Sequence, residues 1–314
     1  MPNYNGVWSL TTQYQYASDW SADNVSPATR TLNGIAIISN ASGLQTFSVA
    51  TQGNSTDFGD FTTQRGKGAG FGSTTRGVVG GGSGPVNIID FITFLTTGDA
   101  TDFGDLTVAR EECAGHSSST RGLIAGGDTG SKSDVIDYVT IASAGNATDF
   151  GNLAAANTSP SGAGSSVRMV IGGGIESSSR VNRIQYVTIA STGNSTDFGD
   201  LSFNNAQGDA LSSATRTVFT GGYGTSSSDT LEYVTTDTTG NVTDFGNLSQ
   251  GTRRLASTSN ATRGVMAGGD GSNLRSKIEF ITIASTGNSS SFGNLLANTD
   301  SCNSGFSSAH GGLQ

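Results

Sequence analysis

The sequence has little charge, little proline and very little histidine or cysteine. Only 13% of the 314 residues are charged, and the chain contains four prolines, two histidines and two cysteines. No apolar run approaches the roughly 18 residues of a membrane-spanning helix, and the N-terminus lacks the basic and apolar regions of a signal peptide. The net charge is −9 and no basic run occurs. We therefore expect neither a nucleic-acid partner nor electrostatic docking on an anionic membrane.

The scarcity of histidine and cysteine also limits the chemistry that the chain can perform. No cysteine or histidine cluster has the spacing of a zinc site, and His116 and His310 are too few to indicate a Ser–His–acid set. The glycine-rich run at 80–84 lacks the lysine and the helix of a phosphate-binding loop. The acidic pair at 111–112 is interpreted as solvated. The sequence therefore predicts a protein that is not an enzyme and has no cofactor and no metal.

Glycine, in contrast, is abundant, with 46 residues, and a short motif recurs along the chain. One copy is Thr148–Leu153 (TDFGNL), and its phenylalanine, Phe150, has five counterparts. The copies are Thr56–Gly59, Thr101–Gly104, Thr196–Gly199, Thr243–Gly246 and the degenerate Ser290–Gly293. Successive phenylalanines of the six copies are 45, 47, 48, 47 and 47 residues apart. A fixed period of this length indicates repeated supersecondary units.

Each unit reads as four short antiparallel strands. In the third unit we expect strands near Gly122–Ala125, Val135–Ala142, Thr148–Leu153 and Ser159–Ser166. The β-branched second run and the glycine–asparagine pair at 145–146 are typical of a strand followed by a tight hairpin. Other positions repeat as well. A tyrosine or phenylalanine stands 12 residues before the motif phenylalanine at Phe91, Tyr138, Tyr186, Tyr233 and Phe280, and 11 residues before it at Phe47.

These features resemble kelch repeats, in which an apolar strand ends in Gly-Gly, a tyrosine-containing strand follows, and an aromatic residue lies in the fourth strand. Phenylalanine replaces the usual tryptophan here. The resemblance covers residues 30–314 and implies an all-β fold, a six-bladed kelch-like β-propeller with four antiparallel strands per blade. We expect the C-terminal strand near Ser301–Ser308 to pair with Ile35–Ile38 and close the ring, which removes an exposed strand edge.

A charged column accompanies the repeat. An arginine lies 19 residues after the motif aspartate in five units, and in the sixth the two positions become Ser291 and His310. The pairs are Asp57 and Arg76, Asp102 and Arg121, Asp149 and Arg168, Asp197 and Arg216, and Asp244 and Arg263. The joint change in the sixth unit indicates a structural Asp–Arg bridge between neighbouring blades. The alternative is a charged ring that binds a ligand.

Other candidate sites have structural interpretations. Cys113 and Cys302 occupy equivalent places in non-neighbouring units, too far apart for a disulfide, so we expect buried thiols. Glycosylation sequons coincide with the hairpins at Asn54, Asn146, Asn194, Asn241 and Asn288, where turn chemistry explains the asparagines. A calcium site in a loop such as that of Asp128 or Asp270 is left open.

Residues 1–29 do not follow the period and contain both tryptophans. The segment includes Trp8, Tyr14, Tyr16 and Trp20. One interpretation is a strap packed on the protein's own blades. The other is an attachment segment, because Trp and Tyr are enriched as anchors at interfaces.

The repeats also resemble kelch-like repeats in virion proteins of tailed bacteriophages, and Gly6–Leu10 is similar to the N-termini of other phage structural proteins. This resemblance implies a structural or adhesive component of the virion: a tail fibre, baseplate or decoration protein. Residues 1–29 would bind other virion proteins in a homo-oligomer, and host-surface glycans are a further candidate partner. The alternatives are a carbohydrate-binding lectin, with loop residues such as Tyr223 at the site, and a kelch-fold oxidase, for which the chain has too few metal ligands.

Overall fold

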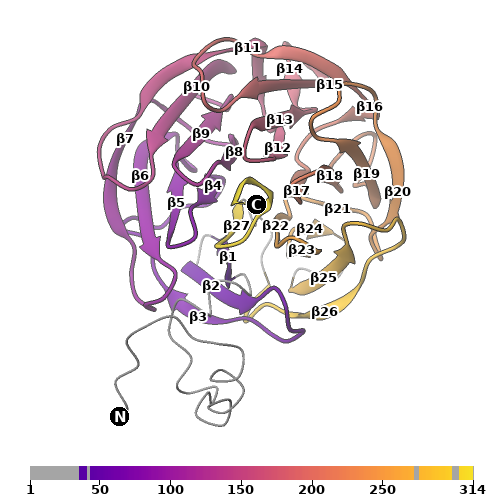
Figure 1. Ribbon diagram of the computed structural model, residues 1–314, viewed down its shortest axis with the longest axis horizontal. Coiled ribbons are helices and arrows are strands. Elements are labelled where there is room, and N and C mark those ends of the chain that lie inside the picture. The colour runs from indigo at the N-terminus through magenta and orange to yellow at the C-terminus, as the bar shows by residue number, and fades with distance from the viewer. Residues whose placement is uncertain (1–34, 41–42, 272–275, 299–303, 314) are drawn as a thin grey trace, which may run out of the picture.

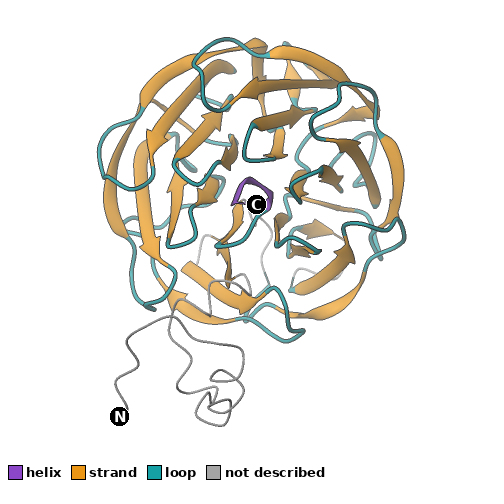
Figure 2. Cartoon of the chain, viewed as in Figure 1, coloured by secondary structure: helices purple, strands orange, loops and turns teal. Residues whose placement is uncertain are grey.

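The computed structural model describes residues 35–40, 43–271, 276–298 and 304–313. Within these ranges the regular elements are twenty-seven strands and one 3-10 helix, η2 (Gly311–Leu313). All strand pairings among the described residues are antiparallel, and Figure 2 shows strands and loops apart from the short helix near the C-terminus. The prediction of an all-β protein is therefore confirmed. The predicted attachment residues Trp8, Tyr14, Tyr16 and Trp20, and Cys302, lie outside the described residues.

Twenty-four of the strands form six groups of four, numbered here in chain order. Group 1 contains β27 (Ser304–Ser307), β1 (Ile35–Asn40), β2 (Gly43–Ser48) and β3 (Thr56–Gly59). Group 2 contains β4 (Ala69–Gly72), β5 (Arg76–Gly80), β6 (Val86–Thr93) and β7 (Thr101–Arg110). Group 3 contains β8 (Ala114–Ser117), β9 (Arg121–Ala125), β10 (Ser133–Thr140) and β11 (Thr148–Thr158).

The second half of the chain repeats this arrangement. Group 4 contains β12 (Ser161–Gly164), β13 (Arg168–Gly172), β15 (Ser179–Thr188) and β16 (Thr196–Asn205). Group 5 contains β17 (Asp209–Ser212), β18 (Arg216–Thr220), β19 (Thr230–Thr235) and β20 (Thr243–Asn247). Group 6 contains β22 (Ala256–Ser259), β23 (Arg263–Ala267), β25 (Lys277–Thr282) and β26 (Ser290–Asn294). The short β14 (Ile175–Glu176) joins groups 3 and 4, and β21 (Thr252–Arg253) pairs with β24 (Asp270–Gly271).

The six groups lie around a common centre, where the C-terminus is found (Figure 1). The innermost strands contact one another in a complete cycle, in the order β27, β4, β8, β12, β17, β22 and back to β27. The outermost strands carry the repeated Thr-Asp-Phe-Gly motif and form the perimeter. We call the line through the centre the axis of the molecule.

The hydrophobic core is divided into six clusters, each shared by two neighbouring groups. The cluster of groups 1 and 2 contains Leu44 and Phe58 with Val79 and Ile92, and the other clusters follow the same plan around the ring. The last one joins group 6 to group 1 and packs Phe292 with Phe47. Because each group buries both faces against its neighbours, no group has a complete core of its own.

Each repeat contains four strands near the predicted positions, but the strand expected at 159–166, β12, pairs with β13 of the next group, and group 3 contains β8 in its place. The predicted pairing of the C-terminal strand with Ile35–Ile38 is confirmed, because β27 pairs antiparallel with β1, with Phe306 opposite Ile37 and Ser304 opposite Ser39. The aromatic residue 12 positions before the motif phenylalanine packs edge-on against it, as Tyr138 does on Phe150 with ring centroids 6.0 Å apart. Phe47 is one residue out of step, so it projects from the opposite face of its strand and contacts group 6 instead.

Candidate functional site

The predicted Asp–Arg bridges do not form. All ten residues of the column are described, and no ion pair joins any of Asp57–Arg76, Asp102–Arg121, Asp149–Arg168, Asp197–Arg216 and Asp244–Arg263. The five aspartates are exposed. Each directly precedes the buried motif phenylalanine, and successive side chains of a strand point to opposite faces. The strand orientation that buries the phenylalanine therefore turns the aspartate before it toward solvent.

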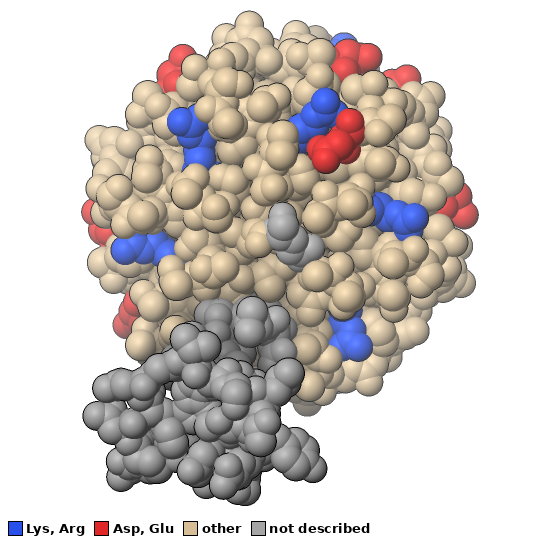
Figure 3. Space-filling view, viewed as in Figure 1, with Lys and Arg blue, Asp and Glu red and all other residues tan. Residues whose placement is uncertain are grey.

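The arginines of the column instead stack on aromatic rings of their own groups. Guanidinium carbons lie over Phe91 at 4.3 Å, Tyr138 at 4.5 Å, Tyr186 at 4.4 Å, Tyr233 at 4.1 Å and Phe280 at 4.7 Å. Four of them also donate Nη1 to a backbone carbonyl of the next group, as Arg76 does to Ile141 at 2.9 Å. Basic patches accordingly circle the centre of one face (Figure 3). These four arginines therefore clamp adjacent groups together: each holds its own group by a cation–π contact and the next group by a hydrogen bond to a carbonyl.

A second set of equivalent positions in the repeat, which was not predicted from the sequence, carries buried polar side chains. We call it the buried polar column. It lies 13 residues before the motif phenylalanine and consists of Gln45, Asp90, Asp137, Gln185, Glu232 and Glu279. Each side chain accepts a hydrogen bond of 2.9–3.2 Å from a backbone N–H of the preceding group. The bond from Leu296 to Gln45 joins group 6 to group 1. The sequence pattern that could have revealed this column is a single polar residue at a constant place in an otherwise apolar strand.

Two members of this column also form buried ion pairs. Arg65 contacts Asp90 at 2.7 Å and Arg110 contacts Asp137 at 3.0 Å, and all four side chains are at most 2% exposed. Each arginine donates to a backbone carbonyl as well. Because each buried charge has an opposite partner, removing one member would leave the other uncompensated, which is strongly destabilising.

The hairpin asparagines act as caps for the neighbouring group, in keeping with their interpretation as turn residues. In all six groups the side-chain oxygen of the hairpin residue accepts a hydrogen bond of 3.0–3.1 Å from a backbone N–H at the outer strand of the preceding group. The accepting residues are the aspartate Asp99 and the asparagines Asn146, Asn194, Asn241, Asn288 and Asn54. Backbone bonds from the same hairpins run alongside, such as Gly145 N–H to the Phe103 carbonyl at 2.7 Å. The repeated Asn, Phe and Gly residues thus form a belt around the perimeter.

The strongest candidate site lies on the axis, at the beginning of the inner strands. A cavity of about 70 Å³ is lined there by residues of groups 1 to 6. Five residues at its rim stand nine positions after the motif phenylalanine; we call them the axial ring: Lys67, Glu112, Ser159, Gln207 and Arg254. All five have positive φ, between 54° and 59°. Clustered residues in this sparsely populated conformation are a feature of ligand-binding sites.

Backbone hydrogen bonds hold the axial ring in this conformation. Glu112 N–H donates to the Lys67 carbonyl, Ser159 to Glu112, Gln207 to Ser159, and Arg254 to Gln207, at 2.7–3.2 Å. Each bond joins one group to the next. The left-handed turn is therefore required by the contact between groups, and it directs side chains of different chemistry toward one cavity.

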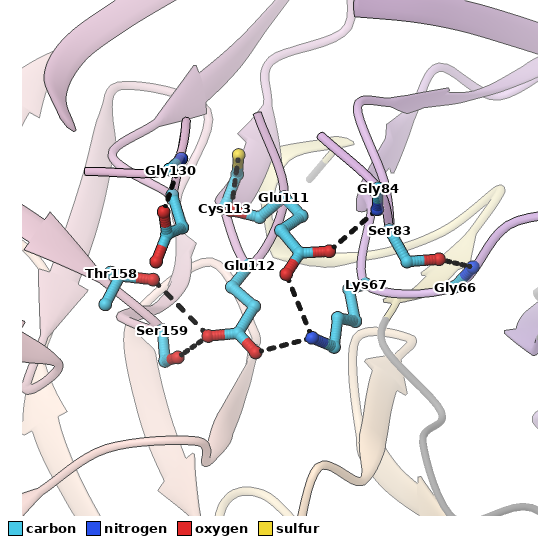
Figure 4. Close-up of polar contacts among 11 residues, drawn as sticks. Gly66, Lys67, Ser83, Gly84, Glu111, Glu112, Cys113, Gly130, Thr158 and Ser159 are labelled. Atoms are coloured by element: carbon cyan, nitrogen blue, oxygen red, sulfur yellow. Dashed lines mark hydrogen bonds and ion pairs between the residues drawn. The ribbon is translucent and has the colours of Figure 1, made fainter. Parts of the chain in front are cut away.

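The acidic pair at 111–112 is not solvated as predicted, because it binds the axial ring's lysine. Lys67 Nζ lies 3.0 Å from both Glu111 and Glu112, and Ser159 donates its hydroxyl to Glu112 (Figure 4). Burial alone would lower the pKa of Lys67, but its bonds to the two glutamates raise it above the ordinary value. Burial would raise the pKa of Glu112, but Ser159 and Lys67 lower it below the ordinary value. Both side chains are therefore charged at neutral pH.

Asp209, in the wall of the cavity, is a charged residue at a repeat position where other groups have a small one. It stands eleven positions after the motif phenylalanine, where the other described groups have Ala69, Ala114, Ser161 and Ala256. Its carboxylate accepts the backbone N–H groups of Ala210 and Ser257. Removal from water raises its pKa to about 7, although these two bonds oppose the shift. The cavity therefore contains a carboxyl group that titrates near neutral pH.

The C-terminal segment closes the opposite end of the axis. His310 hydrogen-bonds the Gly72 carbonyl at 2.9 Å, at the end of β4, and His116 bonds the Ser165 carbonyl at 3.0 Å. The two rings pack edge-on with centroids 5.4 Å apart. Burial lowers the pKa of His116 to about 3 and that of His310 to about 4, so both are neutral at pH 7. The two histidines are structural members of this closure.

Cys113 is buried and free, as expected. Burial raises the pKa of its thiol to about 11, which keeps it in the unreactive protonated form. Tyr223, the loop aromatic of the lectin alternative, has the guanidinium groups of Arg180 and Arg253 over its ring at 4.4 and 4.7 Å. Its ring therefore stacks on protein cations.

The loops considered for calcium have protein partners. Asp128 accepts the Gly130 N–H at 2.7 Å, and Asp270 forms an ion pair with Arg253 at 2.7 Å. Across the described ranges, no three His, Cys, Asp or Glu side chains gather as a metal site would require. In the part of the chain that the structure describes, no helix is long and apolar enough to span a membrane.

Comparison with known proteins adds no relative: no family model matches the chain, and no curated protein matches it.

Proposed function

We propose that the six groups are the blades of a six-bladed, kelch-like β-propeller, and that the protein is a non-enzymatic structural and attachment component of a phage particle. The cyclic order of the inner strands and of the six core clusters supports the propeller. So does the pairing of β27 with β1, which closes the ring with a strand from each end of the sequence.

One observation carries the non-enzymatic role: the repeated polar residues are used to hold the groups together. The hairpin asparagines form the belt, the arginines clamp adjacent groups, and the buried acids and amides bond the backbone of the preceding group. His116 and His310 are neutral and bonded to carbonyls, and Cys113 is protonated. This is the chemistry of a rigid scaffold that displays loops and faces to partners.

The assignment to a phage particle rests on the resemblance of the repeats to virion proteins and on residues 1–29. In this proposal the aromatic residues Trp8, Tyr14, Tyr16 and Trp20 bind neighbouring virion proteins, and the propeller faces outward as one copy of a homo-oligomer. Host-surface glycans are the partners of the displayed domain.

Deletion of residues 1–22 tests the attachment role. The shortened protein should keep the circular dichroism spectrum and melting temperature of the full chain, because the ring closes without those residues. It should nevertheless be missing from purified particles when it replaces the full-length protein during infection, as measured by immunoblotting. A W8A/W20A variant should behave in the same way.

Normal incorporation of the deleted protein would refute the attachment role. Loss of folding would support the other interpretation, in which residues 1–29 are a strap on the protein's own blades. Absence of the full-length protein from particles would refute the virion assignment itself.

A further inference from the structure

We propose that the axial cavity is a binding site for one neutral saccharide unit, held by Asp209, Gln207 and Arg254. This inference deepens the proposed function and rests on it for its biological setting, because it identifies the part of the molecule that would contact a surface glycan. The site itself is argued from the contacts and charges of the cavity.

Two polar side chains of the cavity, those of Gln207 and Arg254, offer groups without a hydrogen-bond partner among the described residues. The side-chain oxygen Oε1 of Gln207 is buried and has no hydrogen-bond donor among the residues that the structure describes. The Arg254 guanidinium, which has five donors, makes no side-chain hydrogen bond to any residue that the structure describes. A buried acceptor without a donor costs about 1–3 kcal/mol, so a native protein that keeps one in a cavity is suited to a ligand that donates to it.

The charges of the lining residues favour a neutral ligand. The cavity is lined by two cations, Lys67 and Arg254, and by two carboxyl groups, Glu112 and Asp209. Lys67 is paired with both Glu111 and Glu112, and Arg254 and Asp209 place one further group of each sign in the wall. A strongly anionic or cationic ligand would therefore meet a group of its own sign, whereas a neutral ligand would not.

The hydrogen-bonding groups of the cavity match those of a sugar. Gln207 Oε1 and the Asp209 carboxylate are acceptors, while Arg254 is a donor. A hydroxyl group is both donor and acceptor, so adjacent hydroxyls of one sugar ring match both kinds of group. The remaining wall consists mainly of Ala and Gly residues such as Ala69 and Gly305. These small residues leave room for several water molecules or for the edge of a pyranose ring.

The position of Asp209 in the repeat supports a role in binding. Four described groups place Ala or Ser at the same position, so the fold tolerates a small residue there. The two carboxylate oxygens of Asp209 accept one backbone N–H each, from Ala210 and Ser257, and each oxygen keeps a further lone pair that a ligand hydroxyl can use. The protein has Asp at this one place, beside Gln207 and within the cavity.

The experiment measures the binding of D-glucose, D-galactose, D-mannose and N-acetyl-D-glucosamine to the purified full-length protein by NMR titration. At least one should bind, and Asp209→Ala should raise its dissociation constant at least tenfold. Ser161→Ala, at the equivalent position of group 4 but outside the cavity lining, is the matched control and should leave the constant unchanged. Both variants introduce a residue that the repeat already accepts at this position, so both should fold.

Three results would overturn the proposal. They are no binding of any of the four sugars, equal binding by wild type and the Asp209→Ala variant, and tighter binding of D-glucuronate or glycine than of the neutral sugars. A protein that binds no sugar but joins particles would leave the proposed structural function intact. A protein that binds sugar at this cavity but is missing from particles would refute only the virion assignment.

Discussion

At the scale of single residues, Asp209 couples the stability of the protein to pH. Its pKa is raised from 3.8 to about 7 in the folded state. Between about pH 4 and 7 the folded protein therefore holds a proton that the unfolded chain has lost, so this group makes stability fall as pH rises. Above pH 7 its contribution is constant. A shift of this size corresponds to a few kcal/mol, on the order of 1.4 kcal/mol per pH unit.

We therefore expect Asp209→Ala to gain stability relative to the wild type as the pH is raised from 5 to 8. The free energy of unfolding, from denaturant titrations at several pH values, is the measurement. The buried histidines act in the opposite direction, since their lowered pKa makes stability fall as pH drops below about 6.5. They are present in both proteins and cancel in the difference. A constant difference across the range would contradict the assignment.

A second residue-scale prediction concerns the buried ion pair of Arg110 and Asp137, whose side chains are fully buried. Asp137→Ala leaves the guanidinium uncompensated in the core and should destabilise the protein by about 3–5 kcal/mol. The control is Asp149→Ala, an exposed aspartate of the adjacent strand, which should change the free energy of unfolding by less than about 0.5 kcal/mol. Similar losses in the free energy of unfolding for the two variants would contradict a stabilising role of the buried ion pair.

At the scale of strands and hairpins, the belt depends on glycine where two groups meet. Gly104 has φ +145°, and a Cβ there would lie 2.5 Å from the carbonyl oxygen of Gly145 in the next group. A Cβ on Gly145 itself would meet nothing within 4 Å. Gly104→Ala should therefore destabilise the protein by more than about 2 kcal/mol, and Gly145→Ala by less than about 1 kcal/mol. Equal losses in denaturant titrations would refute this account of the belt.

At this scale the sequence predicts much of the fold but little of the chemistry. The strands and hairpins could be predicted because each depends on a local pattern repeated six times, and the closing pair could be predicted because one strand is left over after the sixth copy. The Asp–Arg bridge was predicted from constant spacing, but spacing does not reveal which face of a strand a side chain occupies, and Asp149 faces solvent. The axial ring could not be predicted because its members differ in residue type, from Lys67 to Ser159, so the sequence shows no repeated residue at this position.

At the scale of the whole molecule, the last strand holds the ring together. Removal of residues 304–314 deletes β27, its bonds to β1 and the buried Phe306. We expect the truncated protein to be destabilised by more than the roughly 3–5 kcal/mol of a Phe→Ala change and to aggregate through the exposed strand edge. Removal of residues 311–314 alone keeps β27 and should leave a monodisperse, folded protein in size-exclusion chromatography. A soluble, cooperatively folded 1–303 fragment would contradict this role of β27.

The pairing of β27 with β1 also dictates when the protein can finish folding. The other five groups are formed by consecutive stretches of chain, so their contacts are local in sequence and can form quickly. Group 1 must wait for residues at opposite ends of the sequence to meet, which requires the entropy of closing a loop that spans the whole domain. During synthesis this step is impossible until β27 has left the ribosome. A nascent chain therefore carries an unpaired β1 edge for almost the whole of its translation, and this edge is the place where a chaperone would be needed.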